Sequence, residues 1–112
     1  AMKVHNTLGP GFPEKIYHRA LAIEFTEAKL NFEHEKNKNI YYQGIKIGAR
    51  RVDFIVEDQI VVELKAVIQL EDAHLAQAKN YTTAYRFPLG LLINFGAKKL
   101  EYKLLFRAGY TG

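Results

Sequence analysis

The sequence predicts an α/β domain in which helices flank a mixed central β-sheet, in the order α-β-β-β-α-β-β. Three observations favour this fold class. Residues 51–66 alternate between apolar and polar side chains with the period of a strand. Residues 13–29 repeat their apolar side chains at helical spacing. Residues 89–95 form a continuous apolar run, as expected of a strand that is buried on both faces.

The stretch 51–66 is predicted to be a hairpin of two short strands. The even-numbered positions of both strands, Val52 included, are apolar and share one face, whereas Asp53, Glu63 and Lys65 point to the other. A three-residue loop keeps both apolar sets on the same side of the sheet. This register pairs Asp53 with Glu63, and residues paired in this way have Cβ atoms roughly 4.5–5.5 Å apart.

Two carboxylates at this separation repel each other, and the pKa of one of them should rise unless a cation compensates their charge. A divalent cation would remove the conflict, and hard oxygen ligands suit Mg²⁺ or Mn²⁺. The alternative for Glu63 and Lys65 is an ion pair on the strand face, worth roughly 0–1 kcal/mol if it is exposed. With Asp53 opposite Glu63, that alternative explains less of the pattern.

The segment before the hairpin begins with a turn-rich stretch and a helix. Residues 5–13 contain several glycines and prolines, and the helix is predicted from about Pro13 to Lys29. Pro13 suits the first helical position, and Glu14 in the first turn complements the helix dipole. Glu14 also falls on the side of Tyr17, at the edge of the buried face. Taken alone, Glu14 is best interpreted as a residue that only stabilises the helix.

Residues 31–42 alternate loosely and predict an edge strand, followed by turns at Gln43-Gly44 and at residues 46–48. Arg50 and Arg51 then precede the acidic pair. They either balance the charge of the carboxylates or contact a phosphate group. The sequence leaves both interpretations open.

A second helix is predicted from about Glu71 to Arg86, because acidic residues open it and Pro88 follows its end. His74, Gln77 and Tyr81 lie on one stripe of this helix. A polar stripe is usually exposed to solvent, but the tyrosine and the neighbouring alanines indicate close packing, so a role in lining a site is plausible. His74 is expected to be a hydrogen-bonded partner and not a metal ligand.

The remaining chain is predicted to contain the buried strand over residues 89–95, a turn at Gly96 and a last strand over residues 100–106. The whole chain, residues 1–112, is expected to form one domain. Residues 107–112 are expected to be a flexible tail.

Composition limits the class of protein. With 48% hydrophobic and 25% charged residues the chain is close to the globular average, which argues against disorder. The absence of cysteine excludes a disulfide framework and a thiolate metal site. No apolar run approaches the roughly 20 residues that span a bilayer, and no signal peptide is evident, so a cytoplasmic protein without a membrane partner is expected. The net charge of +4 is compatible with a polyanionic partner.

Several motifs occur in the order of a known group of enzymes. They are a GxxExxY pattern over Gly11–Tyr17, Asp53 followed by Glu63-Leu64-Lys65, a QxxxY helix over Gln77–Tyr81, and a closing strand over Leu92–Gly96. With these motifs the chain resembles the PD-(D/E)XK, or restriction-endonuclease-like, nuclease superfamily and, within it, the bacterial GxxExxY proteins. The resemblance runs from about His5 to Arg107. Val52 stands where the superfamily's name places a proline.

The resemblance implies a Mg²⁺- or Mn²⁺-dependent nuclease. Asp53 and Glu63 would hold the metal, the Leu64 carbonyl could add a backbone oxygen, and Glu14 could complete the metal shell. Lys65 would orient or deprotonate the attacking water. The resemblance and the charge pattern also indicate residues that support the site, namely Gln77, Tyr81, Tyr17 and His74. Residues that would contact the nucleic acid are Arg50, Arg51 and Lys79.

Three functions are compatible with these residues. The first is a nuclease, with DNA as the favoured substrate. The second is a non-catalytic nucleic-acid-binding module that keeps the fold, and the third is a partner-binding subunit whose acidic cluster is incidental. An intact Asp, Glu and Lys set favours the first. Because one small protomer contacts little duplex, a homodimer or a partner protein is plausible.

Overall fold

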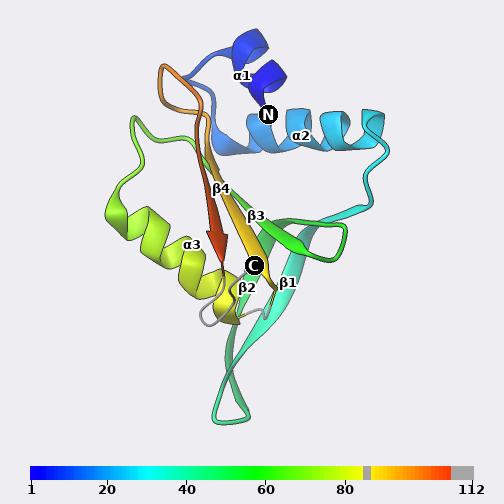
Figure 1. Cartoon of the computed structure of the whole chain (residues 1–112), viewed down its shortest axis with the longest axis vertical. Coiled ribbons are helices and arrows are strands. Elements are labelled where there is room, and N and C mark those ends of the chain that lie inside the picture. Colours follow the sequence, from blue (N-terminus) through cyan, green and yellow to red (C-terminus); the bar gives the residue numbers. More distant parts are fainter. Residues whose placement is uncertain (85–86, 107–112) are drawn as a thin grey trace.

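The computed structural model describes residues 1–84 and 87–106 as three helices and five strands (Figure 1). The elements are α1 (Met2–Leu8), α2 (Glu14–Glu27), β1 (Phe32–Tyr42), β2 (Ile45–Val56), β3 (Ile60–Lys65), α3 (Asp72–Ala84), β4 (Leu89–Asn94) and β5 (Glu101–Phe106). The predicted order of the strands and of the two longer helices is therefore confirmed. The predicted helix end at Arg86 and the predicted tail lie outside the described residues.

The sheet is mixed, as predicted. Its strands lie in the order β1-β2-β3-β4-β5, with β3 and β4 parallel and the other neighbours antiparallel. In Figure 1, α1 and α2 lie together at one end of the molecule, and α3 lies to one side of the sheet. The packing of α3 on β4 is close, because a Cβ atom at Gly90 would lie 2.1 Å from Thr82 Oγ1.

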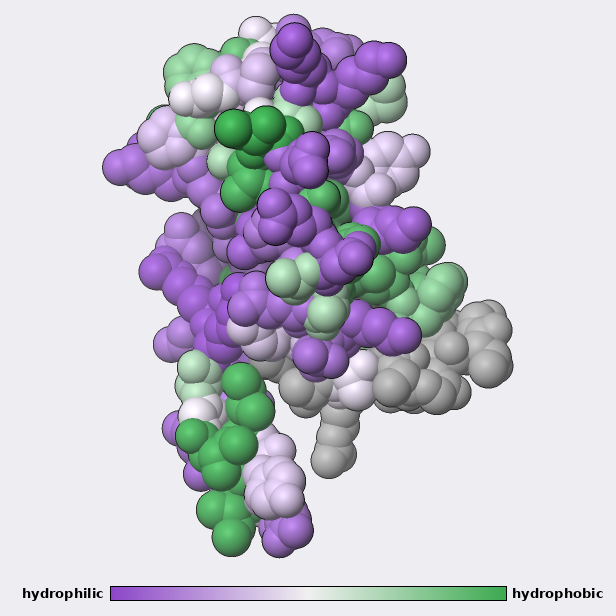
Figure 2. Space-filling view, turned by 90° about the vertical axis from the view of Figure 1, so that its left-hand side faces the viewer, coloured by the Kyte–Doolittle hydropathy of each residue, from purple (hydrophilic) through white to green (hydrophobic). Residues whose placement is uncertain are grey.

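Two predictions of turns are wrong. The turn-rich stretch before α2 begins with a helix, α1, whose His5 Nε2 lies 2.8 Å from the carbonyl oxygen of Ala97. Residues 46–48 do not form a turn, because β2 runs without interruption from Ile45 to Val56. Gly48 is therefore a strand residue in the long hairpin of β1 and β2, which projects from the fold (Figure 1) and ends in a hydrophobic patch that includes Ile45 and Ile47 (Figure 2).

The register of the β2–β3 hairpin is the predicted one. Phe54 pairs with Val62 and Val56 with Ile60, across a three-residue loop. Continuing this register would place Asp53 opposite Glu63, although the ladder of paired residues ends at Phe54–Val62. The hairpin therefore brings the two predicted metal ligands to adjacent strands.

The apolar face of the hairpin differs from the prediction at Val52. This side chain packs with Ile55 and Val61 in a small second cluster, whereas Phe54 and Val56 belong to the main core. The simple alternation of side chains is therefore interrupted between Val52 and Phe54, at Asp53. β3 has buried residues on both faces, as expected of a central strand.

Tyr17 connects the core to the loop that precedes α2. Its ring is fully buried and stacks on Phe95 with ring centroids 4.8 Å apart. Its hydroxyl donates a hydrogen bond to the Gly9 carbonyl at 2.6 Å and accepts one from the Phe12 N–H at 3.2 Å. Gly11 in this loop has φ +108°, a conformation that glycine adopts readily. Tyr17 thus fixes the point at which α2, and with it Glu14, begins.

Candidate active site

Glu63 is the buried acid of the site. Only 4% of the residue is exposed, and its Oε1 atom accepts a hydrogen bond from Arg50 Nη1 at 2.8 Å. The Arg50 guanidinium in turn lies over the Tyr81 ring, 4.0 Å from its centroid. Burial raises the pKa of Glu63 to about 7, Arg50 opposes this shift, and the neighbouring Asp53 adds to it. The sequence-based expectation of one raised pKa in the acidic pair is correct in direction, but burial, and not repulsion by Asp53, is the main cause.

The side chain of Asp53, a residue of β2, faces both β3 and α2. Its Oδ2 atom accepts a hydrogen bond from the Leu64 N–H at 2.8 Å, and its Oδ1 atom is 3.9 Å from His18 Nδ1. About a quarter (26%) of its side chain is exposed. Asp53 also contributes to the raised pKa of Glu63, so the two carboxylates interact with each other.

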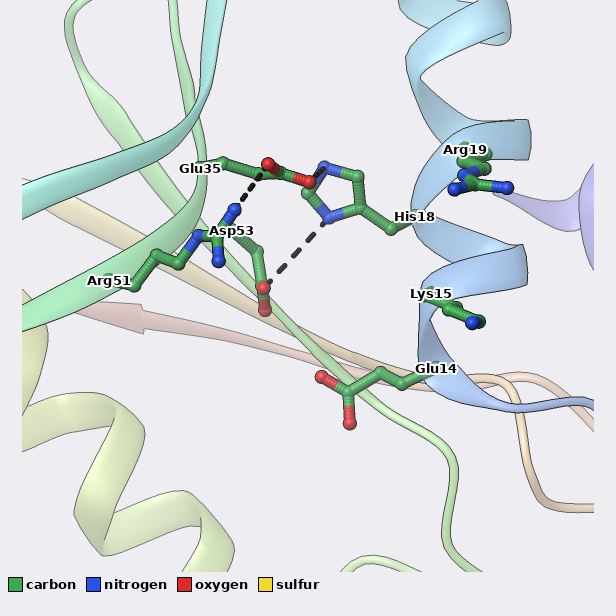
Figure 3. A pocket seen from close by; sticks show the side chains of 7 residues that line it. All are labelled: Glu14, Lys15, His18, Arg19, Glu35, Arg51 and Asp53. Carbon is green, nitrogen blue, oxygen red and sulfur yellow. Dashed lines mark hydrogen bonds and ion pairs between the residues drawn. The ribbon is translucent and has the colours of Figure 1, made fainter.

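Glu14 is brought to the same place by α2. Figure 3 shows its carboxylate turned toward the space that Asp53 also faces. Loss of solvent around this group raises the pKa of Glu14, Asp53 raises it further, and Lys65 and Arg50 lower it. The four residues predicted to be catalytic therefore interact electrostatically, although they come from one helix and two strands.

Lys65 ends β3, where the chain is held by Asn94 of β4. The fully buried Asn94 pairs with Lys65 in the parallel ladder, accepts a hydrogen bond from the Val67 N–H at 2.9 Å and donates one to the Val67 carbonyl at 2.9 Å. At Gly96 a Cβ atom would lie 2.5 Å from the carbonyl carbon of Ala66. Asn94 and Gly96 thus fix the path of the chain directly after Lys65.

The supporting positions are placed in different surroundings. His74 Nδ1 accepts a hydrogen bond from the Glu71 N–H at 3.0 Å at the start of α3, which is the hydrogen-bonded type of role expected for it. Gln77 and Lys79 are exposed on α3. Tyr81 contacts Arg50, and Arg51 forms an ion pair with Glu35. Arg50 and Arg51 thus both pair with carboxylates in this structure.

A pocket of about 310 Å³ opens between α2 and the first two strands. Its lining residues are Glu14, Lys15, His18, Arg19, Glu35, Arg51 and Asp53 (Figure 3). His18 is the histidine of this lining, and only 8% of the residue is exposed. Burial lowers the pKa of His18, and the nearby Asp53 and Glu35 oppose that shift.

Sequence reasoning missed His18 and Glu35. One signal was available for His18, because it follows Glu14 by four residues and therefore lies on the same helix face. No comparable signal exists for Glu35, which belongs to an edge strand that looks like ordinary charged surface. The part of the chain that the structure describes contains no helix long and apolar enough to cross a membrane.

Comparison with known proteins identifies the fold. A family model described as PD-(D/E)XK nuclease superfamily matches residues 1–105. The crystal structure of SSO0001 superposes with a TM-score of 0.64 at 21% sequence identity, over 84% of this chain and 50% of that one. At this identity the likeness concerns the fold alone, and this chain spans about half the length of SSO0001. Among curated proteins no sequence matches this chain.

Proposed function

The chain belongs to the PD-(D/E)XK nuclease superfamily, and from this premise we propose that it is a Mg²⁺- or Mn²⁺-dependent nuclease that hydrolyses phosphodiester bonds, preferably of DNA. The observation that carries the proposal is the hydrogen bond of 2.8 Å from the Leu64 N–H to Asp53, which holds Asp53 beside Glu63 and Lys65 on β3. Glu14 interacts electrostatically with Asp53 and Lys65. The narrower assignment to the GxxExxY proteins stays a prediction.

The donor atoms of this site fit a hard divalent cation. Asp53, Glu63, Glu14 and the Leu64 carbonyl offer only oxygen ligands, which Mg²⁺ and Mn²⁺ prefer. Burial and Asp53 raise the pKa of Glu63 to about 7, and a bound cation would stabilise the charged carboxylate in place of a proton. When bound, such a cation supplies an activated water and offsets charge on the scissile phosphate.

The side chains around the carboxylates have separate tasks in this proposal. Lys65 orients or deprotonates the attacking water and offsets negative charge that develops on the phosphate. Tyr17 positions the start of α2 and therefore Glu14. Tyr81 orients Arg50, and His74 caps the helix that carries Gln77. The surface cations Arg51 and Lys79 contact the nucleic-acid backbone.

A second candidate function is a nucleic-acid-binding module without catalysis. One observation favours it: the 2.8 Å contact from Arg50 already compensates the charge of Glu63, so the acid has a partner without a metal. A binder of this kind would show salt-dependent affinity without metal-dependent cleavage.

The test is cleavage of single-stranded, duplex and branched DNA, and of RNA, with Mg²⁺ or Mn²⁺. Wild type is compared with Asp53→Asn and Lys65→Ala. The matched controls are Asp58→Asn in the hairpin loop and Lys98→Ala, two exposed positions that carry the same chemical changes outside the site. Thermal melting verifies that each variant is folded.

The nuclease proposal expects cleavage by wild type and both controls, and loss of cleavage in the two site variants. Equal cleavage by all five proteins would identify a contaminating nuclease. Binding without cleavage in every preparation would make the binding module the leading function. We further propose one cytoplasmic domain that acts as a homodimer or with a partner protein, which sedimentation analysis with and without DNA would test.

A further inference from the structure

Three side chains next to the proposed nuclease centre form a compact group of different chemistry. His18 of α2 and His34 and Glu35 of β1 each offer one ligand atom, and these atoms all lie within 4.8 Å of one another. His18 Nε2 is 3.4 Å from His34 Nδ1 and 3.8 Å from Glu35 Oε1. We propose that these three residues form a binding site for a transition-metal ion such as Zn²⁺, separate from the all-oxygen site at Asp53 and Glu63.

The ligand set determines the class of ion. Two imidazole nitrogens and one carboxylate form a set that binds Zn²⁺ and leaves a fourth position for water or another ligand. Imidazole suits Zn²⁺, Co²⁺, Ni²⁺ and Cu²⁺, whereas Mg²⁺ prefers oxygen alone. The two neighbouring sites would therefore select different ions.

The backbone of Glu35 is the second observation. Consecutive side chains of a strand point to opposite faces, so His34 and Glu35 should lie on different sides of β1. Glu35 instead has φ +54°, a left-handed conformation that residues other than glycine rarely adopt. As a result, the carboxylate of Glu35 and the imidazole of His34 both lie close to Nε2 of His18. Strained backbone of this kind is concentrated at ligand and active sites.

The imidazole rings of His18 and His34 both pack against the ring of Phe54. The ring of His18 stacks on the fully buried Phe54, with ring centroids 4.2 Å apart. The ring of His34 lies nearly parallel to that of Phe54, with a centroid distance of 6.1 Å and an interplanar angle of 14°. The other nitrogen of His18, Nδ1, faces Asp53 Oδ1 at 3.9 Å. This distance is too long for a hydrogen bond, so the position of the His18 ring is set by Phe54, and Nε2 is the nitrogen that faces His34 and Glu35.

Arg51 is a further partner of Glu35, because its guanidinium forms an ion pair with the Oε2 atom of that carboxylate. Oε1, the other oxygen, is the one that faces His18. A metal ligated by Oε1 would therefore leave the ion pair in place, with Arg51 fixing the orientation of the carboxylate. Such a metal would join the helix α2 to the edge strand β1.

The test is titration of the untagged, EDTA-treated protein with Co²⁺, followed by the visible absorption of the bound ion, and displacement by Zn²⁺. His34→Asn and Glu35→Gln change exposed residues of the site, and His74→Asn is the matched control on α3. Asp53→Asn with Glu63→Gln removes the all-oxygen site. Circular dichroism checks the fold of each variant.

We expect one Co²⁺ per chain in wild type, in His74→Asn and in the variant that lacks the all-oxygen site. His34→Asn and Glu35→Gln should weaken binding by at least roughly 10- to 100-fold, the size of effect seen when the surroundings of metal ligands are altered. Zn²⁺ should raise the melting temperature of wild type and not of His34→Asn. Unchanged binding in His34→Asn, or loss of binding only in the Asp53→Asn/Glu63→Gln variant, would overturn the proposal.

Discussion

The guanidinium of Arg50 on β2 pairs with the buried carboxylate of Glu63 on β3 at 2.8 Å and at the same time covers the ring of Tyr81 on α3. One arginine thus joins two strands and a helix at the position where the chain buries an acid. This arrangement leads to the first of five predictions.

Arg50→Met should destabilise the protein because Glu63 loses its cationic hydrogen-bond donor. We expect a loss of about 1–3 kcal/mol in the free energy of unfolding at pH 8, with the partial exposure of Arg50 limiting the effect. Urea unfolding measures it. The loss should shrink at pH 5, where Glu63 is protonated, and in a Glu63→Gln background. An equal loss at both pH values would contradict the pairing as its cause.

The stability of the metal-free protein should depend on the titration of Glu63. Burial raises the pKa of Glu63 to about 7 in the folded chain, above the 4.5 of a solvent-exposed glutamate, so the folded state binds this proton more tightly. The contribution of Glu63 to stability is full below pH 4.5 and is lost as the pH rises through 7. At about 1.4 kcal/mol per pKa unit, the change is on the order of 3 kcal/mol. Urea unfolding in EDTA, with Glu63→Gln as the control, should show a smaller decline for the variant.

Gly96→Ala should impair both stability and cleavage. Its Cβ atom would lie 2.5 Å from backbone atoms of Ala66 and Val67, so the chain directly after Lys65 has to shift. Overpacking of this kind costs about 1–3 kcal/mol. Gly48→Ala is the control, since a Cβ atom there has no neighbour within 4 Å. Equal melting temperatures of the two variants would show that the loop after β3 adapts freely.

Tyr17→Phe should separate anchoring of the loop from packing of the core. The ring still stacks on Phe95, but the hydrogen bonds to Gly9 and from Phe12 are lost. We expect a loss of about 1–2 kcal/mol in the free energy of unfolding and weaker cleavage, because the start of α2 positions Glu14. Tyr102→Phe, at an exposed tyrosine, should change neither quantity. A fully active, fully stable Tyr17→Phe protein would rule out the anchoring role.

The residues that sequence reasoning placed correctly follow strict periodicities. The register of β2 and β3 was predictable because a slip by one residue would expose the apolar set that includes Phe54 and Val62. Continuing that register places Asp53 next to Glu63, although the ladder ends at Phe54 and the alternation of β2 is interrupted at Asp53, which the sequence does not predict. The start of α2 near Glu14 was predictable from Pro13 and the apolar stripe, although Pro13 is the extended residue before the helix and not its first residue.

The features that were missed depend on tertiary contacts. α1 has only seven residues, and a helix this short is marginal without packing such as the burial of Val4. Gly48 is in a strand because the neighbouring β1 pairs with it. The left-handed backbone of Glu35 has no sequence signature, because glutamate seldom adopts it. The candidate metal group at His18 therefore becomes visible only in three dimensions.

β3 is the middle strand of the sheet, with β2 on one side and β4 on the other. Glu63 and Lys65 therefore stand on a strand that has hydrogen-bonded neighbours at both edges, and elements of this kind open only with much of the fold. Amide hydrogen exchange along β3 should accordingly be the slowest in the protein. If the proposed nuclease function holds, this acid and lysine form a rigid template, and adaptation to the shape of a substrate falls to the periphery, above all to the projecting hairpin of β1 and β2.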